Sequence, residues 1–383
     1  GLRLLPSVYD SKLIQQTLNR KYMELIKKNG KWNPTLLPRE NGEMVMMQTP
    51  QIVSASRSTD IPAFYSDWFF DRLDNGYCAW TNPFNGVRSY VSFLNTRFIV
   101  FWSKNPKPLL SYLDRLEEKK IGCYIQYTLN DYENDRLEIG VPKLSSRIET
   151  FKTLVEKLGK GHVIWRFDPL MLTEDIDISV LLSRIKNIGD QLKGYTEKIV
   201  FSFADIGIYG KVKRNLEDND VRYKEWTKGD MVYFAQELVK LNEMQGWNYE
   251  LATCAEEIDL EGVIHNHCID DELIIRLAYQ DKVLMDFLKV KILPMPIPNL
   301  FGDTEELPKD AILLPNNMYA THGCNKDSGQ RKFCGCINAK DIGQYNTCVH
   351  LCEYCYANSS KAAAKANYQC HLSNPKAETI TGK

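Results

Sequence analysis

Short apolar runs and amphipathic stretches alternate along the middle of the chain. Six runs rich in β-branched and aromatic residues each end in polar side chains, at residues 52–56, 98–102, 123–129, 163–167, 199–203 and 249–254. Apolar residues at helical spacing lie between them, over 64–73, 109–116, 147–158, 180–192 and 231–244. Six strand-then-helix units in succession predict parallel strands joined by right-handed crossovers. We therefore expect an α/β fold, a TIM-like (β/α) barrel that is partial or permuted, with a doubly wound open sheet as the alternative.

The segments on either side of these units break the pattern. Residues 1–50 are interpreted as an extension with a short amphipathic helix over 11–28, and residues 51–280 as the barrel. Prolines recur between residues 281 and 320 and exclude a long regular element, which predicts an insertion or lid. Residues 321–383 form a cysteine-rich segment.

Polar residues gather where the six predicted strands end. In a barrel these ends share one mouth, where active sites are built. The candidate catalytic residues are Arg57, Asp60, Lys104, Arg166, Asp168 and Glu256. Cations at a helix N-terminus oppose the helix dipole, so the basic members suit an anionic ligand. Two other interpretations stay open, in which the acidic residues only cap the next helix and the basic residues pair with neighbouring carboxylates.

The overall composition restricts the partners. Lys and Arg number 48 against 49 Asp and Glu, a formal net charge of -1, which provides no general attraction to nucleic acid. No apolar run approaches the roughly 18 residues of a membrane span. The chain also begins without the basic, apolar and small-residue pattern of a secretory leader, so we expect a cytoplasmic protein that does not enter membranes.

The eleven cysteines carry the most specific signal, because six of them fall between residues 324 and 355. Cys348, Cys352 and Cys355 have the spacing C-x3-C-x2-C, with Tyr354 before the last one. Three thiolates on one loop can hold three irons of a [4Fe–4S] cluster and leave the fourth iron open. A structural zinc site is the alternative. We expect Tyr354, and Ser54 at the end of the first strand, to contact the cofactor.

A second metal site is predicted from the remaining cysteines. Cys324, Cys334 and Cys336 lie close in sequence, and Cys254 or Cys268 could supply a fourth thiolate. Either an iron–sulfur cluster or zinc would suit such ligands. Free buried cysteines behave as small apolar residues, which is the interpretation for Cys78 and Cys123.

The loop spacing and the Cys355-Tyr356 ending resemble the cluster loop of the radical S-adenosylmethionine superfamily, including its spore photoproduct lyase branch. That loop follows the first barrel strand in the superfamily, whereas here it follows all six units, which suggests a permuted barrel. Residues 54–65, 326–331, 334–336, 341–345 and 355–357 further resemble a bacterial family of unassigned function that ends in a radical-S-adenosylmethionine-like cysteine cluster.

The resemblance implies an enzyme that reductively cleaves S-adenosylmethionine to start radical chemistry on a small, anionic substrate. It implies an electron donor such as flavodoxin or ferredoxin. A photoproduct-lyase-like repair enzyme and a zinc-binding structural or interaction protein are the alternatives. We expect the cysteine loop to fold back over the strand ends and face Arg57, Lys104, Arg166 and Asp168, with residues 294–315 as the return path.

Overall fold

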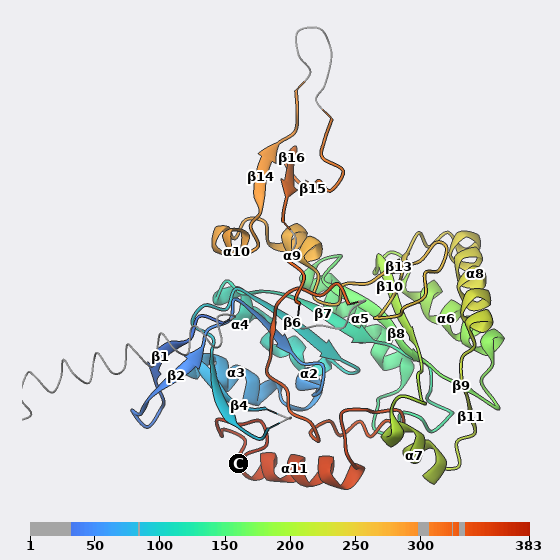
Figure 1. The fold of residues 1–383 in the computed structure, drawn as a ribbon, viewed down its shortest axis with the longest axis horizontal. Coiled ribbons are helices and arrows are strands. Elements are labelled where there is room, and N and C mark those ends of the chain that lie inside the picture. Colours follow the sequence, from blue (N-terminus) through green and yellow to red (C-terminus); the bar gives the residue numbers. More distant parts are fainter. Residues whose placement is uncertain (1–31, 83–84, 298–305, 324, 329–333) are drawn as a thin grey trace, which may run out of the picture.

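A parallel β-sheet of eight strands forms the centre of the molecule (Figure 1). The computed structural model describes residues 32–82, 85–297, 306–323, 325–328 and 334–383. The helix expected over residues 11–28 and the cysteine at position 324 lie outside this part of the chain.

The six strands predicted from the sequence are all present and lie side by side in chain order. They are β3 (Ile52–Ala55), β6 (Phe98–Ser103), β7 (Gly122–Thr128), β8 (Val163–Leu170), β10 (Lys198–Phe203) and β12 (Glu250–Thr253). Two short strands extend the edges: β13 (Ile264–His265) pairs with β12, and β17 (Lys340–Asp341) pairs with β3. All of these neighbours are parallel, so the carboxyl ends of the strands lie along one edge of the sheet.

The predicted helices also form. They are α2 (Ile61–Phe64) and α3 (Ser66–Asn75), the 3-10 helix η1 (Lys107–Tyr112) with α4 (Leu113–Glu118), α5 (Leu144–Leu158), α6 (Ile178–Leu192) and α8 (Lys228–Gln245). Local chemistry sets their ends. Asp60 caps α2, which has a proline in its first turn, and Thr227 and Asp230 form a capping box at the start of α8. None of the described helices is long and apolar enough to cross a membrane.

Successive residues of each strand face opposite sides of the sheet and build two cores. Ile99 and Phe101 belong to the core that packs against the helices, together with Phe69, Ile148, Leu181 and Phe234. Phe98 and Val100 point to the other face. There they pack with residues of α9 (Asp271–Ala278) and α10 (Lys282–Phe287), and with Cys268 and Cys336.

The strand order resembles that of a barrel, but a closed barrel is not found. Each strand from β3 to β12 lies beside its predecessor, whereas a doubly wound sheet reverses direction at a switch point. The edge strands β13 and β17 do not pair with each other within the described residues. A single backbone hydrogen bond of 3.0 Å, from Ile337 N to Ile269 O, joins the loops beside them. Both edge strands have only two residues, too few for a ladder across the gap.

Three smaller units surround the central sheet. A four-stranded sheet has the order β1 (Thr35–Pro38), β2 (Met44–Gln48), β5 (Arg88–Ser92), β4 (Tyr77–Thr81). The proline-rich stretch contributes β14 (Lys291–Pro294), β15 (Ile312–Leu314) and β16 (Met318–Thr321), an antiparallel arm that projects from the body (Figure 1). The strands β9 (Leu172–Thr173) and β11 (Tyr223–Lys224) form a third pair, and α7 (Gly210–Asp218) precedes β11.

The chain ends with α11 (Lys361–Ser373) and a tail that returns to the four-stranded sheet. Thr379 forms an isolated parallel bridge with Ala79 of β4. Glu378 accepts hydrogen bonds from Arg39 Nε at 3.0 Å and Nη2 at 2.7 Å, and it also pairs with the hydroxyl of Tyr77. The cysteine loop thus lies between two anchored segments, β17 and α11.

Candidate metal centres

The loop that carries Cys348, Cys352 and Cys355 docks at the carboxyl ends of the central strands. Two backbone hydrogen bonds join it to the loop after β7: Gly140 N donates to His350 O at 2.8 Å, and Glu353 N donates to Leu137 O at 2.9 Å. A Cβ added at Gly140 would lie 2.7 Å from His350 O, so glycine permits this close approach. The hydroxyl of Tyr65 donates to Thr347 O at 2.6 Å from the other side.

The three thiols differ in exposure and interact electrostatically with one another. Cys352 is buried, and Cys348 and Cys355 are partly exposed. Burial raises the pKa of all three thiols above the ordinary value. The positive charge of Lys104 acts in the opposite direction on the pKa of Cys352 and of Cys355. A metal ion that binds here would displace the thiol protons, and Lys104 would offset part of the added negative charge.

Asp60 links the first strand end to this loop. Its Oδ2 accepts from His350 Nε2 at 2.7 Å and from Lys104 N at 2.8 Å, and its Oδ1 accepts from Ser103 Oγ at 2.6 Å. Burial disfavours the carboxylate, but the hydrogen bond and charge of His350 outweigh it and lower the pKa of Asp60. The ring of His350 also packs on Phe64, with 4.6 Å between centroids.

Lys104 lies in a second network with Glu138 and Tyr354. Its Nζ donates to Glu138 Oε1 and to Tyr354 Oη, each at 2.9 Å. Tyr354 Oη also bonds to Glu138, and Asn130 Nδ2 donates to the same carboxylate at 3.0 Å. Burial would raise the pKa of Glu138, but the charge of Lys104 leads the interactions that lower it to about 2. Tyr354 is therefore fixed beside the thiols, as its position in the sequence predicts.

A second group of thiols lies where the two edges of the sheet approach each other. Cys254 follows β12, Cys268 follows β13, and Cys334 and Cys336 precede β17. The sulfurs of Cys254 and Cys268 are 3.3 Å apart. Ile269, the residue after Cys268, donates from its backbone N to Cys336 Sγ at 3.4 Å. The structure thus brings together four of the five cysteines predicted for a second site, and Cys324 lies outside the described residues.

The guanidinium groups of Arg57 and Arg166 lie beside this second group, although the carbonyl of Arg57 accepts a hydrogen bond at 3.1 Å from Tyr356, next to Cys355. Arg166 Nη1 is 3.2 Å from Cys268 Sγ, and the charge of Arg57 acts on Cys336, Cys268 and Cys334. Both guanidinium groups stack on Trp102, with 5.3 Å and 5.4 Å from Cζ to the ring centroid. The prediction that both arginines face Cys348, Cys352 and Cys355 was wrong, because Trp102 and the second thiol group occupy their surroundings.

The remaining candidates serve mainly as structural links. Asp168 pairs with Arg166 and Ser202, and Glu256 Oε1 accepts from Phe203 N at 3.0 Å. Ser54 Oγ donates to Asp341 Oδ2 at 2.9 Å and accepts from Trp102 Nε1 at 3.1 Å, so its contacts join β3 to β17 and β6.

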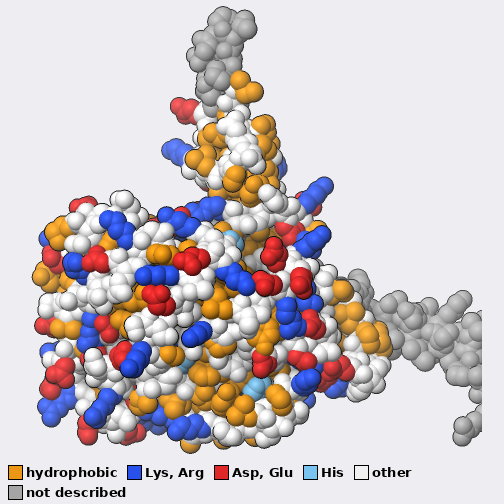
Figure 2. All heavy atoms as spheres, turned by 180° about the vertical axis from the view of Figure 1, so that it is seen from behind, with side chains coloured by type: hydrophobic (Ala, Val, Ile, Leu, Met, Phe, Trp, Pro, Cys, Tyr) orange, Lys and Arg blue, Asp and Glu red, His pale blue; other side chains and the backbone are white. Residues whose placement is uncertain are grey.

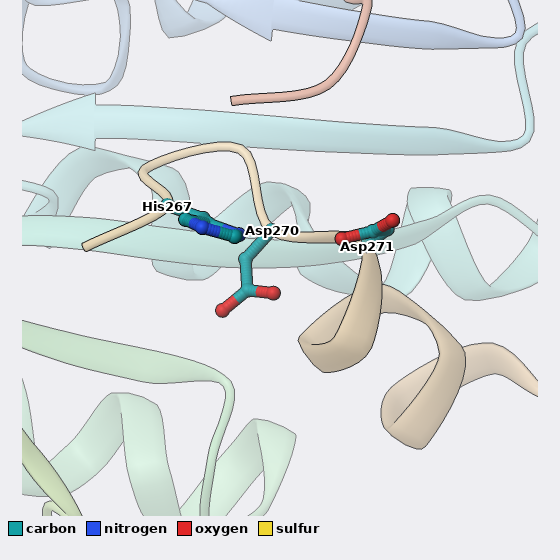
Figure 3. Close-up of side chains that lie close together, drawn as sticks. All are labelled: His267, Asp270 and Asp271. Atoms are coloured by element: carbon teal, nitrogen blue, oxygen red, sulfur yellow. The ribbon is translucent and has the colours of Figure 1, made fainter. Parts of the chain in front are cut away.

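A group of oxygen and nitrogen ligands lies near the second thiols. His267, Asp270 and Asp271 bring one ligand atom each within 4.8 Å of the others, from the loop after β13 and the start of α9 (Figure 3). Asp270 caps α9 by accepting from Leu273 N at 3.3 Å. Asp271 accepts from Asn325 at 3.3 Å and lies 3.3 Å from His322 Nδ1. Capping and local pairing therefore account for both carboxylates.

Two important residues have no role in the sequence prediction. Glu138 lies in the loop after β7, and its function depends on Lys104 and Tyr354, which are distant in sequence. Asp341 accepts from Ser54, from Ser56 Oγ at 2.7 Å and from Arg57 N at 3.0 Å, so it attaches β17 to β3. A signal for Asp341 exists in the sequence, since it follows the Cys334–Cys336 pair by a few residues, but no local pattern indicates its partners.

The fold and the thiols define an α/β protein with a parallel sheet and a cysteine-rich segment at the carboxyl ends of its strands. The chain belongs to the family described as "Domain of unknown function (DUF1848)", whose sequence profile matches residues 52–357. The match starts within β3 and ends beyond Cys355, so it includes the central sheet and both thiol groups. No curated protein and no solved structure matches the chain significantly.

Proposed function

We propose that Cys348, Cys352 and Cys355 hold a [4Fe–4S] cluster and that the protein is an enzyme of the radical S-adenosylmethionine type. The observation that carries the proposal is the docking of a three-thiol loop, in which Cys352 is buried, at the carboxyl ends of parallel strands. The sheet would then be a partial, permuted barrel in which the cluster loop comes last in the chain. When bound, such a cluster supplies an electron that cleaves S-adenosylmethionine and starts radical chemistry.

The residues around the loop suit this cofactor. Thiolates are the ligands that iron–sulfur clusters use, and three on one loop leave an iron open. Lys104 places a cation next to Cys352, which offsets the charge of an anionic cluster. Oε2 of Glu138 is buried without a hydrogen-bond partner, so this carboxylate has an acceptor available for an amino group.

The chain's own residues would position the loop and exclude water. Asp60 and His350 hold the loop against the ends of β3 and β6 through their 2.7 Å contact. Tyr354, bonded to Lys104 and Glu138, covers the side of the loop that faces the strand ends. Proposed partners are a small-molecule substrate and a one-electron donor such as flavodoxin or ferredoxin.

The anionic nature of the substrate stays a prediction. Lys104 and Arg166 are neutralised by Glu138 and Asp168, so the interpretation of these cations as partners of acidic residues applies to both. Lys and Arg mix with Asp and Glu on the face shown in Figure 2, which gives no basic stripe there for a nucleic acid. This observation favours a small molecule over the photoproduct-lyase alternative.

The test is an anaerobic assay with S-adenosylmethionine and dithionite that measures 5′-deoxyadenosine and methionine. We expect the reconstituted protein to form both products, because the open iron needs only an electron and S-adenosylmethionine. The variant Cys348→Ala/Cys352→Ala/Cys355→Ala should form neither. Cys370→Ala is the matched control, since Cys370 is exposed on α11, and it should keep the activity. A wild-type protein that is loaded with iron and sulfide but forms no 5′-deoxyadenosine would refute the proposal.

A further inference from the structure

Four thiols converge at the seam between the two edges of the sheet, away from the cysteine loop. Cys254 and Cys268 come from the β12–β13 edge, and Cys334 and Cys336 come from the segment before β17. Cys268 is central, because its sulfur lies 3.3 Å from that of Cys254 and the next residue, Ile269, donates from its backbone N to Cys336 Sγ at 3.4 Å. Cys268 and Cys336 are 4% and 1% exposed, so the group is largely withdrawn from water.

Two arginines provide positive charge at the same place. Arg166 is 3% exposed, and it donates to Cys268 Sγ from Nη1 while Asp168 pairs with its other nitrogen. Nη2 of Arg57 is buried without a hydrogen-bond partner. Burial lowers the pKa of this guanidinium group, and Cys336 and Asp341 are the first of the neighbours that raise it. Buried charges are paired in native proteins. Asp168 already pairs with Arg166, whereas neutral thiols provide little counter-charge for the guanidinium group of Arg57.

We infer that Cys254, Cys268, Cys334 and Cys336 form a second metal centre, which takes an iron–sulfur cluster or a zinc ion. Four thiolates are the complete ligand set for either one. Zinc with four thiolates carries a net charge of about two minus, and Arg57 and Arg166 together offset it. The inference stands without the proposed function, because none of these four cysteines belongs to the cluster loop.

The backbone around the thiols is arranged for close packing of two distant segments. A Cβ at Gly335 would lie 2.1 Å from the ring of His267, so a larger residue between Cys334 and Cys336 would require this ring to move. Ile269 N donates to Cys336 Sγ at 3.4 Å, next to the bond from Ile337 N to Ile269 O. A metal ion bound here would join the β13 edge to the β17 edge, where the strands themselves do not pair.

A disulfide is the main alternative, since Cys254 and Cys268 have sulfurs 3.3 Å apart. A disulfide requires a distance of about 2.05 Å, which a small side-chain movement would reach. It would consume two thiols and bring no negative charge to Arg57 and Arg166. The two alternatives therefore differ in metal content and in the number of free thiols.

The experiment measures zinc, iron and acid-labile sulfide in anaerobically purified full-length protein. In the Cys348→Ala/Cys352→Ala/Cys355→Ala background, we expect either about one zinc ion per chain or the iron and sulfide of one cluster. Adding Cys268→Ala and Cys336→Ala should remove this metal, and adding Cys370→Ala should not. Zinc and iron identify which occupant the site takes, and either result supports the inference.

A second experiment uses a chain in which Cys348, Cys352 and Cys355 are unchanged. Cys334 is only half-buried, so Cys334→Ser in the otherwise unchanged chain should fold, release the second-site metal and keep the iron of the cluster loop. Equal metal content in the wild type and in Cys334→Ser and Cys268→Ala/Cys336→Ala variants would overturn the inference. A Cys254–Cys268 disulfide in metal-free, anaerobically purified protein would also overturn it.

Discussion

At the carboxyl end of β3, the carboxylate of Asp60 accepts four hydrogen bonds. Two come from the backbone of Ala63 and Lys104, one from Ser103 and one from His350. The sequence suggested a cap or a ligand-binding group for Asp60. The structure assigns it the cap and adds a contact to the cysteine loop, which is nearly 300 positions away in the chain and leaves no local pattern.

The stability that the additional contacts of Asp60 contribute can be measured by comparison with an ordinary helix cap. Asp60→Ala should lower the free energy of unfolding by about 3 kcal/mol, because it removes a cap and leaves buried donors unpaired. Asp177→Ala, at the exposed cap of α6, should cost distinctly less, because water can reach the backbone donors that it leaves. Urea unfolding of the metal-free proteins compares the two. Equal costs would show that the contacts of Asp60 to Ser103 and His350 contribute no stability.

The burial of Glu138 could not be predicted from its own position in the sequence. Its carboxylate is almost fully buried against Lys104, at 1% exposure of the side chain. A glutamate in a polar loop gives no sign of such burial, since the partners come from β6 and from the cysteine loop. Arg57 and Lys104 lie just after β3 and β6, as the sequence predicts, whereas Arg166 lies within β8. The carboxylate partners of the cations could be found only in the folded structure.

At the scale of elements, the apolar runs predicted the strands and helices of the central sheet. They did so because these elements are buried on one or both faces, and burial imposes a hydrophobic period. The strands β1, β2, β4 and β5 were missed, and so was α11, where only Ala364 and His371 are buried. The arm of β14 to β16 was expected to be irregular, yet prolines are tolerated at its strand ends.

An ion pair between Glu378 and Arg39 contributes to the attachment of the tail after α11. Burial raises the pKa of Glu378, but the hydrogen bonds from Arg39 and Tyr77 outweigh it and leave this pKa below the ordinary 4.5. The ionised form therefore stabilises the fold above the unfolded-state pKa, and this contribution disappears as the pH falls through the folded-state pKa.

Glu378→Gln should therefore lower stability by about 1 kcal/mol at pH 7. The gap between wild type and variant should narrow as the pH falls below about 4.5, towards the lowered pKa of Glu378. Urea unfolding at several pH values measures this gap in stability, with Glu237→Gln, at a half-buried carboxylate paired with Lys240, as the control. A gap that stays constant over this range would mean that the ionised Glu378 adds no stability through Arg39.

At the scale of the whole molecule, the strand order determines where the two thiol groups lie, one at the carboxyl ends of the strands and one between the two edges of the sheet. The sheet winds in a single direction from β3 to β12, and its edges approach each other without pairing. The sequence indicated the winding through six repeated units, but closure depends on two-residue strands that leave almost no pattern. The cysteine positions predicted two separate sets of ligands, and the structure places the described cysteines of the second set near the seam between the two edges of the sheet.

The central claim is an open-iron cluster on Cys348, Cys352 and Cys355, and electron paramagnetic resonance of the anaerobic, dithionite-reduced protein tests it most directly. The claim predicts a reduced-cluster signal whose shape changes when S-adenosylmethionine is added, since the open iron gains ligands. This responsive signal should be absent from the Cys348→Ala/Cys352→Ala/Cys355→Ala variant and present in Cys370→Ala. A protein without any cluster signal, or a signal that neither S-adenosylmethionine nor the triple substitution alters, would contradict the claim.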